Sequence, residues 1–182
     1  MKPDSEFDRQ PVLTGRLIEL RPLRSEDFEA VFKAASDPLI WEQHPDRERH
    51  KREVFQKFFD SAMESRGAFA IIERKSGRII GSSRYYEYSA EREVMVGFTF
   101  LERAFWGGAY NSELKSLMLD HAFRFVDRVL FQVGENNLRS QKALEKIGAR
   151  FLERTELPGP NGSMVPCVVY VIFASSQRRG GA

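Results

Sequence analysis

Short stretches in which apolar and polar residues alternate predict most of the strands. The first is "RLIELRPL" at 16–23, and "GAFAIIERKSGRIIGSSRYYEYS" at 67–89 predicts two strands around the turn "KSGR". A further strand is expected at 93–101, "EVMVGFTFL", which is rich in β-branched and aromatic residues. Three consecutive strands indicate an antiparallel meander. Near the C-terminus, 148–157 and 164–173 predict a final pair of strands around the turn "PGPNG".

Apolar residues at helical spacing predict four helices. "EDFEAVFKAAS" at 26–36 ends before an Asp-Pro pair, and "EVFQKFFDSAMES" at 53–65 has one broad apolar face. A long helix is expected from about residue 110, and "SQKALEKIG" at 140–148 ends at a glycine. Between these last two helices, "VLFQV" at 129–133 predicts a short buried strand.

The order of these elements favours an α+β fold. The strand at 93–101, the long helix and the strand at 129–133 predict a right-handed parallel crossover, because parallel strands need such a connection. The expected sheet is therefore mixed, mostly antiparallel and built from about seven strands, with the parallel unit near its centre. A chain of 182 residues is long enough to bury a single core. We expect one domain over residues 1–182, with flexible tails at 1–10 and 175–182.

Composition narrows the function classes only slightly. Hydrophobic residues make up 42% of the chain, charged residues make up 30%, and the formal net charge is +2. The basic residues are spread among acidic ones, so we expect no nucleic-acid partner. Cys167 is the only cysteine, which excludes an internal disulfide and a thiolate metal cluster, so we expect no metal and a reducing compartment. The N-terminus lacks the apolar core of a signal peptide, and no stretch approaches the ~20 apolar residues of a membrane span, so we expect a cytoplasmic protein.

The stretch "FWGGAYNSELK" at 105–115 places two glycines at a predicted strand-to-helix turn. The first N–H groups of a helix have no partner within the helix and carry part of a positive charge, and glycine lets an anion approach the backbone closely. Phosphate is the natural ligand for such a turn. The stretch matches neither "GxGxxG" nor "GxxxxGK" followed by Ser or Thr. The alternative is that Gly107 and Gly108 only make a tight turn.

Two longer segments carry a resemblance to a known family. "VGFTFLERAFWGGAYNSELKSLMLDHAF" and, further along, "NLRSQKALEKIGA" resemble the GNAT superfamily of acetyl-CoA-dependent N-acetyltransferases. Within it, the closest likeness is to the branch that acetylates the N-termini of ribosomal proteins, and the resemblance covers nearly the whole chain. It implies a GNAT-like sheet with helices on both faces, acetyl-CoA as co-substrate, an amine acceptor and, as in many relatives, a homodimer.

The resemblance also assigns coenzyme-binding residues. The family's Gln/Arg-x-x-Gly-x-Gly/Ala loop, whose backbone amides hold the coenzyme A pyrophosphate, falls on the residues from Trp106 to Asn111. Trp106 replaces the usual Gln or Arg and Ala109 replaces the central Gly, which weakens binding if that position needs a positive φ. In the family, the fourth and fifth strands splay apart, and the pantetheine arm pairs with the fourth. The fourth strand here is "VMVGFTFL". The expected coenzyme contacts are Thr99, Phe100, Leu101, Trp106, Gly107, Gly108, Ala109, Tyr110, Asn111, Ser112 and Asn137.

Acetyl transfer needs a deprotonated amine, a polarised thioester carbonyl and a proton for the departing thiolate. In many family members the proton donor is a Tyr seven residues after the Asn of the NxxS/A motif, and that position is Leu144 here. The branch with the closest likeness instead offers Ser140, three residues after Asn137, whose hydroxyl can hydrogen-bond the sulfur. Asn137 would bond the pantetheine or the acetyl-bearing end. The structural alternative is that Asn137 is an ordinary helix N-cap and Ser140 a first-turn residue.

The base and the acceptor site have weaker sequence signals. Glu93 would act as the base through a water molecule, although a cross-strand ion pair is an equal alternative. Trp41 and His44 lie in the loop between the first two helices, which lines the acceptor cleft in relatives, so we expect them to contact the acceptor. Deprotonation by water alone, without an essential base, is a further alternative.

The function expected from these residues is transfer of an acetyl group from acetyl-CoA to a primary amine, by direct attack within a ternary complex. A protein N-terminus and a small amine or amino acid are both candidate acceptors. The alternative is a non-catalytic acyl-CoA-binding sensor or regulatory module. Its signs would be the missing Tyr at position 144 and the placement of a glutamate at 93 instead of at the position of Met95, where the family often has one. Asn137 and Ser140 favour the enzyme.

Overall fold

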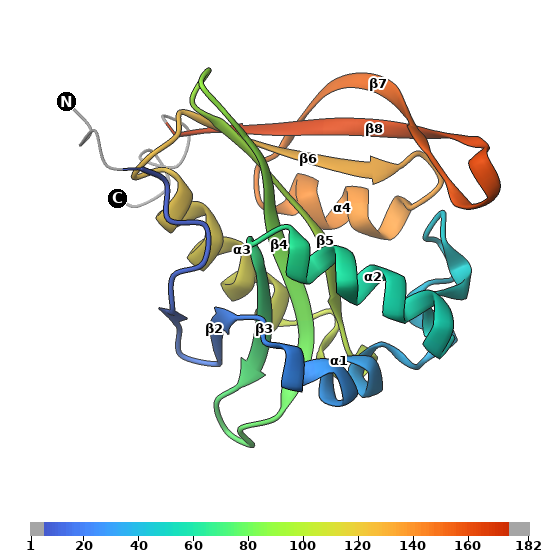
Figure 1. The fold of residues 1–182 in the computed structure, drawn as a ribbon. Helices are drawn as coiled ribbons and strands as arrows, with labels where there is room; N and C mark the ends of the chain where they lie inside the picture. The colour runs from blue at the N-terminus through green and yellow to red at the C-terminus, as the bar shows by residue number, and fades with distance from the viewer. Residues whose placement is uncertain (1–5, 175–182) are drawn as a thin grey trace.

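The computed structural model describes residues 6–174, which form an eight-stranded sheet with helices on both faces (Figure 1). The strand order is β1-β2-β3-β4-β5-β6-β8-β7, and all neighbours are antiparallel except β5 and β6. The strands are β1 (Leu13–Thr14), β2 (Ile18–Pro22), β3 (Ala68–Glu73), β4 (Ile79–Ser89), β5 (Glu93–Leu101), β6 (Arg128–Gly134), β7 (Arg150–Pro158) and β8 (Met164–Phe173). The α-helices are α1 (Phe28–Ala35), α2 (Arg52–Glu64), α3 (Ala109–Ala122) and α4 (Leu138–Lys146). Short 3-10 helices are η1 (Ser25–Asp27), η2 (Pro38–Ile40), η3 (Arg47–His50), η4 (Arg103–Phe105) and η5 (Pro160–Gly162).

The predicted α+β fold is confirmed. β3, β4 and β5 form the expected antiparallel meander, and β5, α3 and β6 form the expected parallel crossover. The sheet has one strand more than predicted, because β1 contains only two residues, too few to show an alternating pattern. Among residues 6–174, no helix is long and apolar enough to cross a membrane.

The two faces of the sheet bury separate groups of side chains. α1 and α2 cover one face and α3 and α4 cover the other, as the alternation along β3 shows. Ala68 and Ala70 pack with the α1 and α2 side chains, whereas Phe69 and Ile71 pack with those of α3. Small residues on one face and large ones on the other let the α1–α2 pair lie close to the strands.

Residues 6–10 do not form the tail that the sequence suggested. Phe7 is 4% exposed, and its ring lies 5.1 Å from the ring of Tyr85 and 5.5 Å from that of Phe125. The next residue accepts a hydrogen bond at its carbonyl from Nε2 of His121, at 2.7 Å. The expectation of a flexible segment over 1–10 is therefore wrong at Phe7. Residues 1–5 and 175–182, the remainder of the two expected tails, lie outside the described residues.

β5 and β6 are paired only at one end. Glu93, Val94 and Met95 are opposite residues of β6, and beyond Met95 the two strands separate while each keeps its other neighbour. Opposite β4, the register of β5 shifts between Gly97 and Phe100, which marks a bulge, and Phe98 has a φ of +52°. A positive φ is unusual for an aromatic residue, so the bulge is a strained point of the sheet. The separation and the bulge create the opening that holds the candidate site.

Candidate active site

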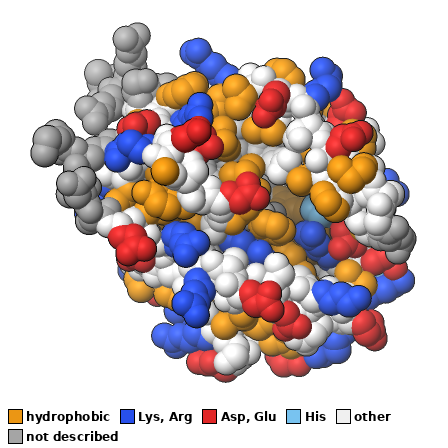
Figure 2. Space-filling model, turned by 45° about the horizontal axis from the view of Figure 1, so that its top comes forward, with side chains coloured by type: hydrophobic (Ala, Val, Ile, Leu, Met, Phe, Trp, Pro, Cys, Tyr) orange, Lys and Arg blue, Asp and Glu red, His pale blue; other side chains and the backbone are white. Residues whose placement is uncertain are grey.

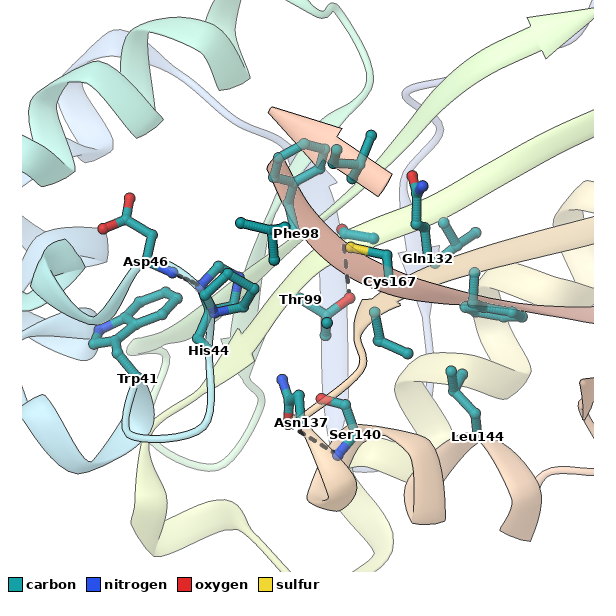
Figure 3. A pocket seen from close by; sticks show the side chains of 18 of the residues that line it. Trp41, His44, Asp46, Phe98, Thr99, Gln132, Asn137, Ser140, Leu144 and Cys167 are labelled. Atoms are coloured by element: carbon teal, nitrogen blue, oxygen red, sulfur yellow. Dashed lines mark hydrogen bonds between the residues drawn. The ribbon is translucent and has the colours of Figure 1, made fainter. Parts of the chain in front are cut away.

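A cavity of about 510 Å³ lies where β5 and β6 separate (Figure 3). Its walls are β5 from Val96 to Thr99, β6 from Phe131 to Gly134, part of α3, the beginning of α4, the loop before α2 and the β7–β8 hairpin. Figure 2 shows a hollow whose walls carry hydrophobic side chains together with basic and His side chains. The cavity thus brings together segments from nearly the whole length of the chain.

The glycine stretch forms an open helix N-terminus. Gly107 has a φ of +70°, which favours glycine, and Gly108 is the N-cap of α3. A Cβ placed on either glycine would meet no atom within 4 Å, so the protein's own packing does not demand a bare backbone at Gly108. Ala109 is the first residue of α3 and is not among the described residues with positive φ, so the missing central glycine causes no strain. Asn111, in the first turn of the helix, lines the cavity.

The side chain of Trp106, which directly precedes the glycines, is fixed by two contacts. Its indole Nε1 donates a hydrogen bond to the carbonyl of Leu101 at 2.9 Å, and the guanidinium carbon of Arg139 lies 4.1 Å from the centre of the ring. Arg139 in turn donates to the carbonyl of Ile40 at 3.0 Å. The indole is therefore held by packing, so Trp106 offers an incoming anion its backbone rather than its side chain.

Asn137 and Ser140 lie together at the start of α4 and both line the cavity (Figure 3). Oδ1 of Asn137 accepts a hydrogen bond from the amide of Ser140 at 3.2 Å, so Asn137 is the N-cap of α4. The N-cap role is the structural alternative that the sequence left open for Asn137. The cap uses only Oδ1 of the side-chain amide. Nδ2 donates to no described residue, and the side chain is 8% exposed. Leu144, one turn further along α4, adds an apolar side chain to the same wall.

Lys115 is a buried lysine in this cavity that the sequence analysis did not single out. It is 7% exposed, and its Nζ lies 3.1 Å from Oγ1 of Thr99 and 5.3 Å from the centre of the Phe131 ring. Oγ1 of Thr99 lies 2.8 Å from Oγ of Ser83. Burial lowers the pKa of Lys115 from 10.5 to about 8, because a charged ammonium loses hydration inside the protein.

The other end of the cavity is formed by the loop before α2. Nε1 of Trp41 donates to the carbonyl of Ala35 at 2.8 Å, and its ring packs 5.3 Å from that of Phe100. Nδ1 of His44 accepts from the amide of Asp46 at 2.9 Å (Figure 3), and Nη1 of Arg49 lies 3.3 Å from Nε2. Burial, together with the nearby charge of Arg49, lowers the pKa of His44 to about 3. His44 is thus neutral, and a weak base, at physiological pH.

Residues 17–150 match the family described as acetyltransferase (GNAT) domain, which is well over half of the chain. The chain belongs to the GNAT acetyltransferase family. The described fold also resembles solved structures. One is a GCN5-related N-acetyltransferase from Brucella melitensis, with a TM-score of 0.82, 19% identity and coverage of 98% of this chain and 83% of that one.

Two further solved structures of similar fold are complexes with coenzyme A or with its disulfide. RimJ from Mycobacterium smegmatis, in complex with CoA-disulfide, has a TM-score of 0.68 and 19% identity, with coverage of 91% of this chain and 87% of that one. Spermidine N-acetyltransferase from Vibrio cholerae, in complex with CoA and spermine, has a TM-score of 0.67 and 14% identity, with coverage of 87% and 96%. At these identities the likeness concerns the fold.

Members of the GNAT family use acetyl-CoA as co-substrate, and the residues present here fit it. The open amides at the start of α3 suit a pyrophosphate, and no described residue comes within 4 Å of a Cβ placed on Gly107 or Gly108. Beyond Met95 no described strand pairs with the edge of β5 that faces β6, so backbone groups along this edge can pair with an extended arm. Phe100 and Leu101 pair with β4 through their other edge, and Thr99 lines the cavity.

Glu93 does not take part in this GNAT site. It lies at the closed end of β5 opposite Arg128, with which it forms an ion pair, and it does not line the cavity. Gly97 lies four positions further along the extended strand, a distance of about 13 Å. The prediction of Glu93 as base is therefore wrong, and its ion-pair alternative holds. A strand pattern gives no information on where two neighbouring strands separate.

Lys115 could have been found from helical spacing. Asn111, Met118 and Ala122 lie four residues before, three residues after and seven residues after it, so all four share one face of α3. Met118 and Ala122 are fully buried, which places the lysine among core positions. A lysine within an apolar stripe is the signal that the sequence analysis did not use.

Proposed function

We propose that this chain is an acetyl-CoA-dependent N-acetyltransferase that transfers an acetyl group to a primary amine by direct attack within a ternary complex. The observation that carries the proposal is that one cavity is lined by the unpaired edge of β5, by the start of α4 and, at its other end, by Trp41 and His44. A co-substrate paired along β5 and an acceptor entering beside His44 would meet at the bulge around Phe98. Such an arrangement favours transfer between two bound substrates.

The coenzyme-binding residues proposed here act through their backbone. The amides from Gly107 to Ser112 at the start of α3 would hold the pyrophosphate, and the edge of β5 at Thr99, Phe100 and Leu101 would pair with the pantetheine arm. Bound acetyl-CoA supplies the acetyl group as a thioester. Asn137 would direct its free Nδ2 toward the pantetheine, and Ser140 would donate its hydroxyl proton in a hydrogen bond to the sulfur.

The acceptor is proposed to be the amine of a protein N-terminus or of a small molecule with a single positive charge. Of the charged residues that line the cavity, Asp46 is the one carboxylate, and Nε of Arg49 lies 3.3 Å from its Oδ2. The other charged residue of the lining is Lys115. A polyamine would bring several positive charges to a wall that offers no unpaired carboxylate, which is electrostatically unfavourable.

Deprotonation of the acceptor is proposed to occur through water. His44 is too weak a base near neutral pH, and Glu93 lies at the closed end of the strands. An amine that reaches the cavity in its neutral form needs only a proton acceptor after attack, which solvent can supply. The rate should then follow the fraction of neutral amine in solution.

The second candidate function is a non-catalytic acyl-CoA sensor. The observation in its favour is the apolar side chain of Leu144 on the wall of the cavity, where a hydroxyl would serve as a proton donor. Titration calorimetry with acetyl-CoA and with dephosphorylated pantetheine tests the phosphate site, since tight binding of acetyl-CoA alone requires it. Release of free coenzyme thiol with peptide and small-amine acceptors then decides between the two functions. Binding without thiol release for any acceptor would support the sensor.

A homodimer also remains a prediction. β7 is the last strand of the sheet, and Phe151, Leu152 and Leu157 on it are exposed. An exposed apolar edge strand suits contact with a second copy. Light scattering after size exclusion measures the state directly.

A further inference from the structure

Within residues 6–174, the ammonium of Lys115 has no carboxylate partner. Its hydrogen bond within the described residues is to a neutral hydroxyl, Oγ1 of Thr99, and the carboxylate of Asp46 in the same cavity is paired with Arg49. A buried charge without a counter-ion costs free energy, so proteins place one inside mostly for a function. An ammonium has three N–H groups, and Thr99 accepts from one of them.

The position of Lys115 relative to β5 is well defined. Thr99 follows the bulge at Phe98, and its Oγ1 is held between Nζ of Lys115 and Oγ of Ser83. The Phe131 ring of β6, 5.3 Å from Nζ, closes the other side. The ammonium therefore stands in the gap between β5 and β6, below the free edge along which the coenzyme arm is proposed to lie.

Few other groups in the lining can release a proton near neutral pH. Burial raises the pKa of the Tyr86 phenol and of the Cys167 thiol, and His44 is already neutral. A serine hydroxyl such as that of Ser140 is a poor acid, and Arg49 stays protonated. Asp46 is ion-paired with Arg49. The titratable groups that line the cavity with Lys115 are thus His44, Asp46, Arg49, Tyr86 and Cys167.

We propose that Lys115 is a catalytic residue, the acid that protonates the coenzyme A thiolate as it leaves. This inference rests on the proposed function. As the acceptor nitrogen bonds to the acetyl carbon, the carbon–sulfur bond breaks and its electron pair goes to sulfur. Lys115 gives one ammonium proton to that sulfur and becomes a neutral amine. The proton that the acceptor nitrogen loses goes to water, and Lys115 regains a proton from solvent, so the cycle consumes only acetyl-CoA and amine.

The pKa of Lys115, lowered to about 8, suits this role. Lowering the pKa from 10.5 to about 8 makes the Lys115 ammonium a stronger acid than an ordinary lysine, and so a better proton donor to the departing thiolate.

The test is the ionisation of the thiol in bound coenzyme A, which needs no acceptor. Coenzyme A is bound to the wild-type protein and to Lys115→Met, Lys115→Arg and Lys142→Met, and thiolate absorbance is followed against pH after subtraction of the protein alone. An ammonium near the sulfur should lower the thiol pKa by about 1–3 units in the wild type, and Lys115→Met should remove this shift. Lys115→Arg should retain it. Lys142 is exposed on α4 and outside the lining, so Lys142→Met is the matched control.

Each result of this titration either supports or overturns the proposed role of Lys115. If coenzyme A binds and its thiol titrates alike in wild type and Lys115→Met, or as it does in free solution, Lys115 is not beside the sulfur and this inference alone is overturned. If no protein binds coenzyme A, the proposed function falls and the role of Lys115 falls with it. The wild-type measurement decides by itself should Lys115→Met not fold.

Discussion

Oδ1 of Asn137 accepts a hydrogen bond from the amide of Ser140 at 3.2 Å, and both side chains line the same cavity. A single residue therefore caps α4 while leaving its Nδ2 free toward the cavity. The cap and the proposed coenzyme contact can be separated by substitution. Asn137→Asp keeps an acceptor oxygen for the cap but loses the Nδ2 donor, whereas Asn137→Ala loses both.

The first prediction concerns the hydroxyl group of Ser140. Ser140→Ala should leave the melting temperature and the acetyl-CoA dissociation constant nearly unchanged and lower kcat by about tenfold, because one hydrogen bond to the sulfur is lost. Steady-state kinetics and calorimetry on the same preparation measure both. An unchanged kcat would restrict Ser140 to a structural place in the first turn of α4.

The second prediction is a pH dependence that comes from Lys115. With a pKa of about 8, Lys115 carries its proton below pH 8 and loses it above, so kcat should decline as pH rises past 8. Lys115→Met should lack this decline and have a kcat about 100-fold lower at neutral pH, with little change in KM for acetyl-CoA. The measurement is a kcat profile from pH 6 to about 10. A decline that persists in Lys115→Met would belong to another group.

The third prediction concerns the stability cost of the same lysine. The pKa of Lys115 falls from 10.5 to about 8 on folding, so between these values the unfolded chain binds more protons and the free energy of unfolding rises with pH. At pH 7 the cost is up to about 3 kcal/mol. Lys115→Met should therefore melt at a higher temperature than wild type at pH 7, and the difference should narrow toward pH 10. Equal melting curves at pH 7 would show that the ammonium is hydrated in the folded protein.

The fourth prediction separates the turn from the phosphate site. Gly108 has a φ of −125° and no neighbour within 4 Å of a Cβ, so Gly108→Ala should not change the melting temperature. The added methyl group would stand at the proposed pyrophosphate site, and acetyl-CoA should bind about tenfold more weakly. Gly108→Pro removes the amide as well and should abolish measurable binding. If both variants bind acetyl-CoA as the wild type does, the glycines only make a turn.

The fifth prediction concerns the acceptor. An acceptor with one amine, such as a peptide N-terminus, should have a kcat/KM at least about tenfold higher than spermidine, because the paired state of Asp46 leaves no carboxylate for a second ammonium. Thiol release at equal acceptor concentrations measures the ratio. A preference for spermidine would show that Arg49 gives up its contact with Asp46 when the acceptor binds.

The sequence predicted the elements of the sheet because their periods are local. The antiparallel meander and the parallel crossover needed only the alternation of strands and helices and the rule for parallel connections. The glycine turn before α3 was recognisable from its residue types. Its proposed contacts use backbone N–H groups, which every residue except proline provides.

Three features depended on the tertiary structure and were not predicted. Phe7 is one aromatic residue among charged ones, so no periodic pattern showed that the sheet and α3 would bury it. Glu93 was assigned to the site on its place in a strand. The strand pattern does not show how far a residue lies from the point where β5 and β6 separate, so it could not exclude Glu93. Lys115 was not singled out, since burial of a charged side chain depends on the neighbours that fold around it.

The separation of β5 and β6 has a consequence for the protein in the cell. The two parts of the sheet are joined through β5 and β6 at only three residue pairs, Glu93 with Arg128, Val94 with Val129 and Met95 with Leu130. A co-substrate that pairs along the free edge would act as the missing strand and tie these parts together. At 100 times its dissociation constant, a ligand adds about 2.7 kcal/mol to the free energy of unfolding. The lifetime of this protein against proteolysis would then rise and fall with the acetyl-CoA supply, so that its abundance follows the metabolic state even where its activity is saturated.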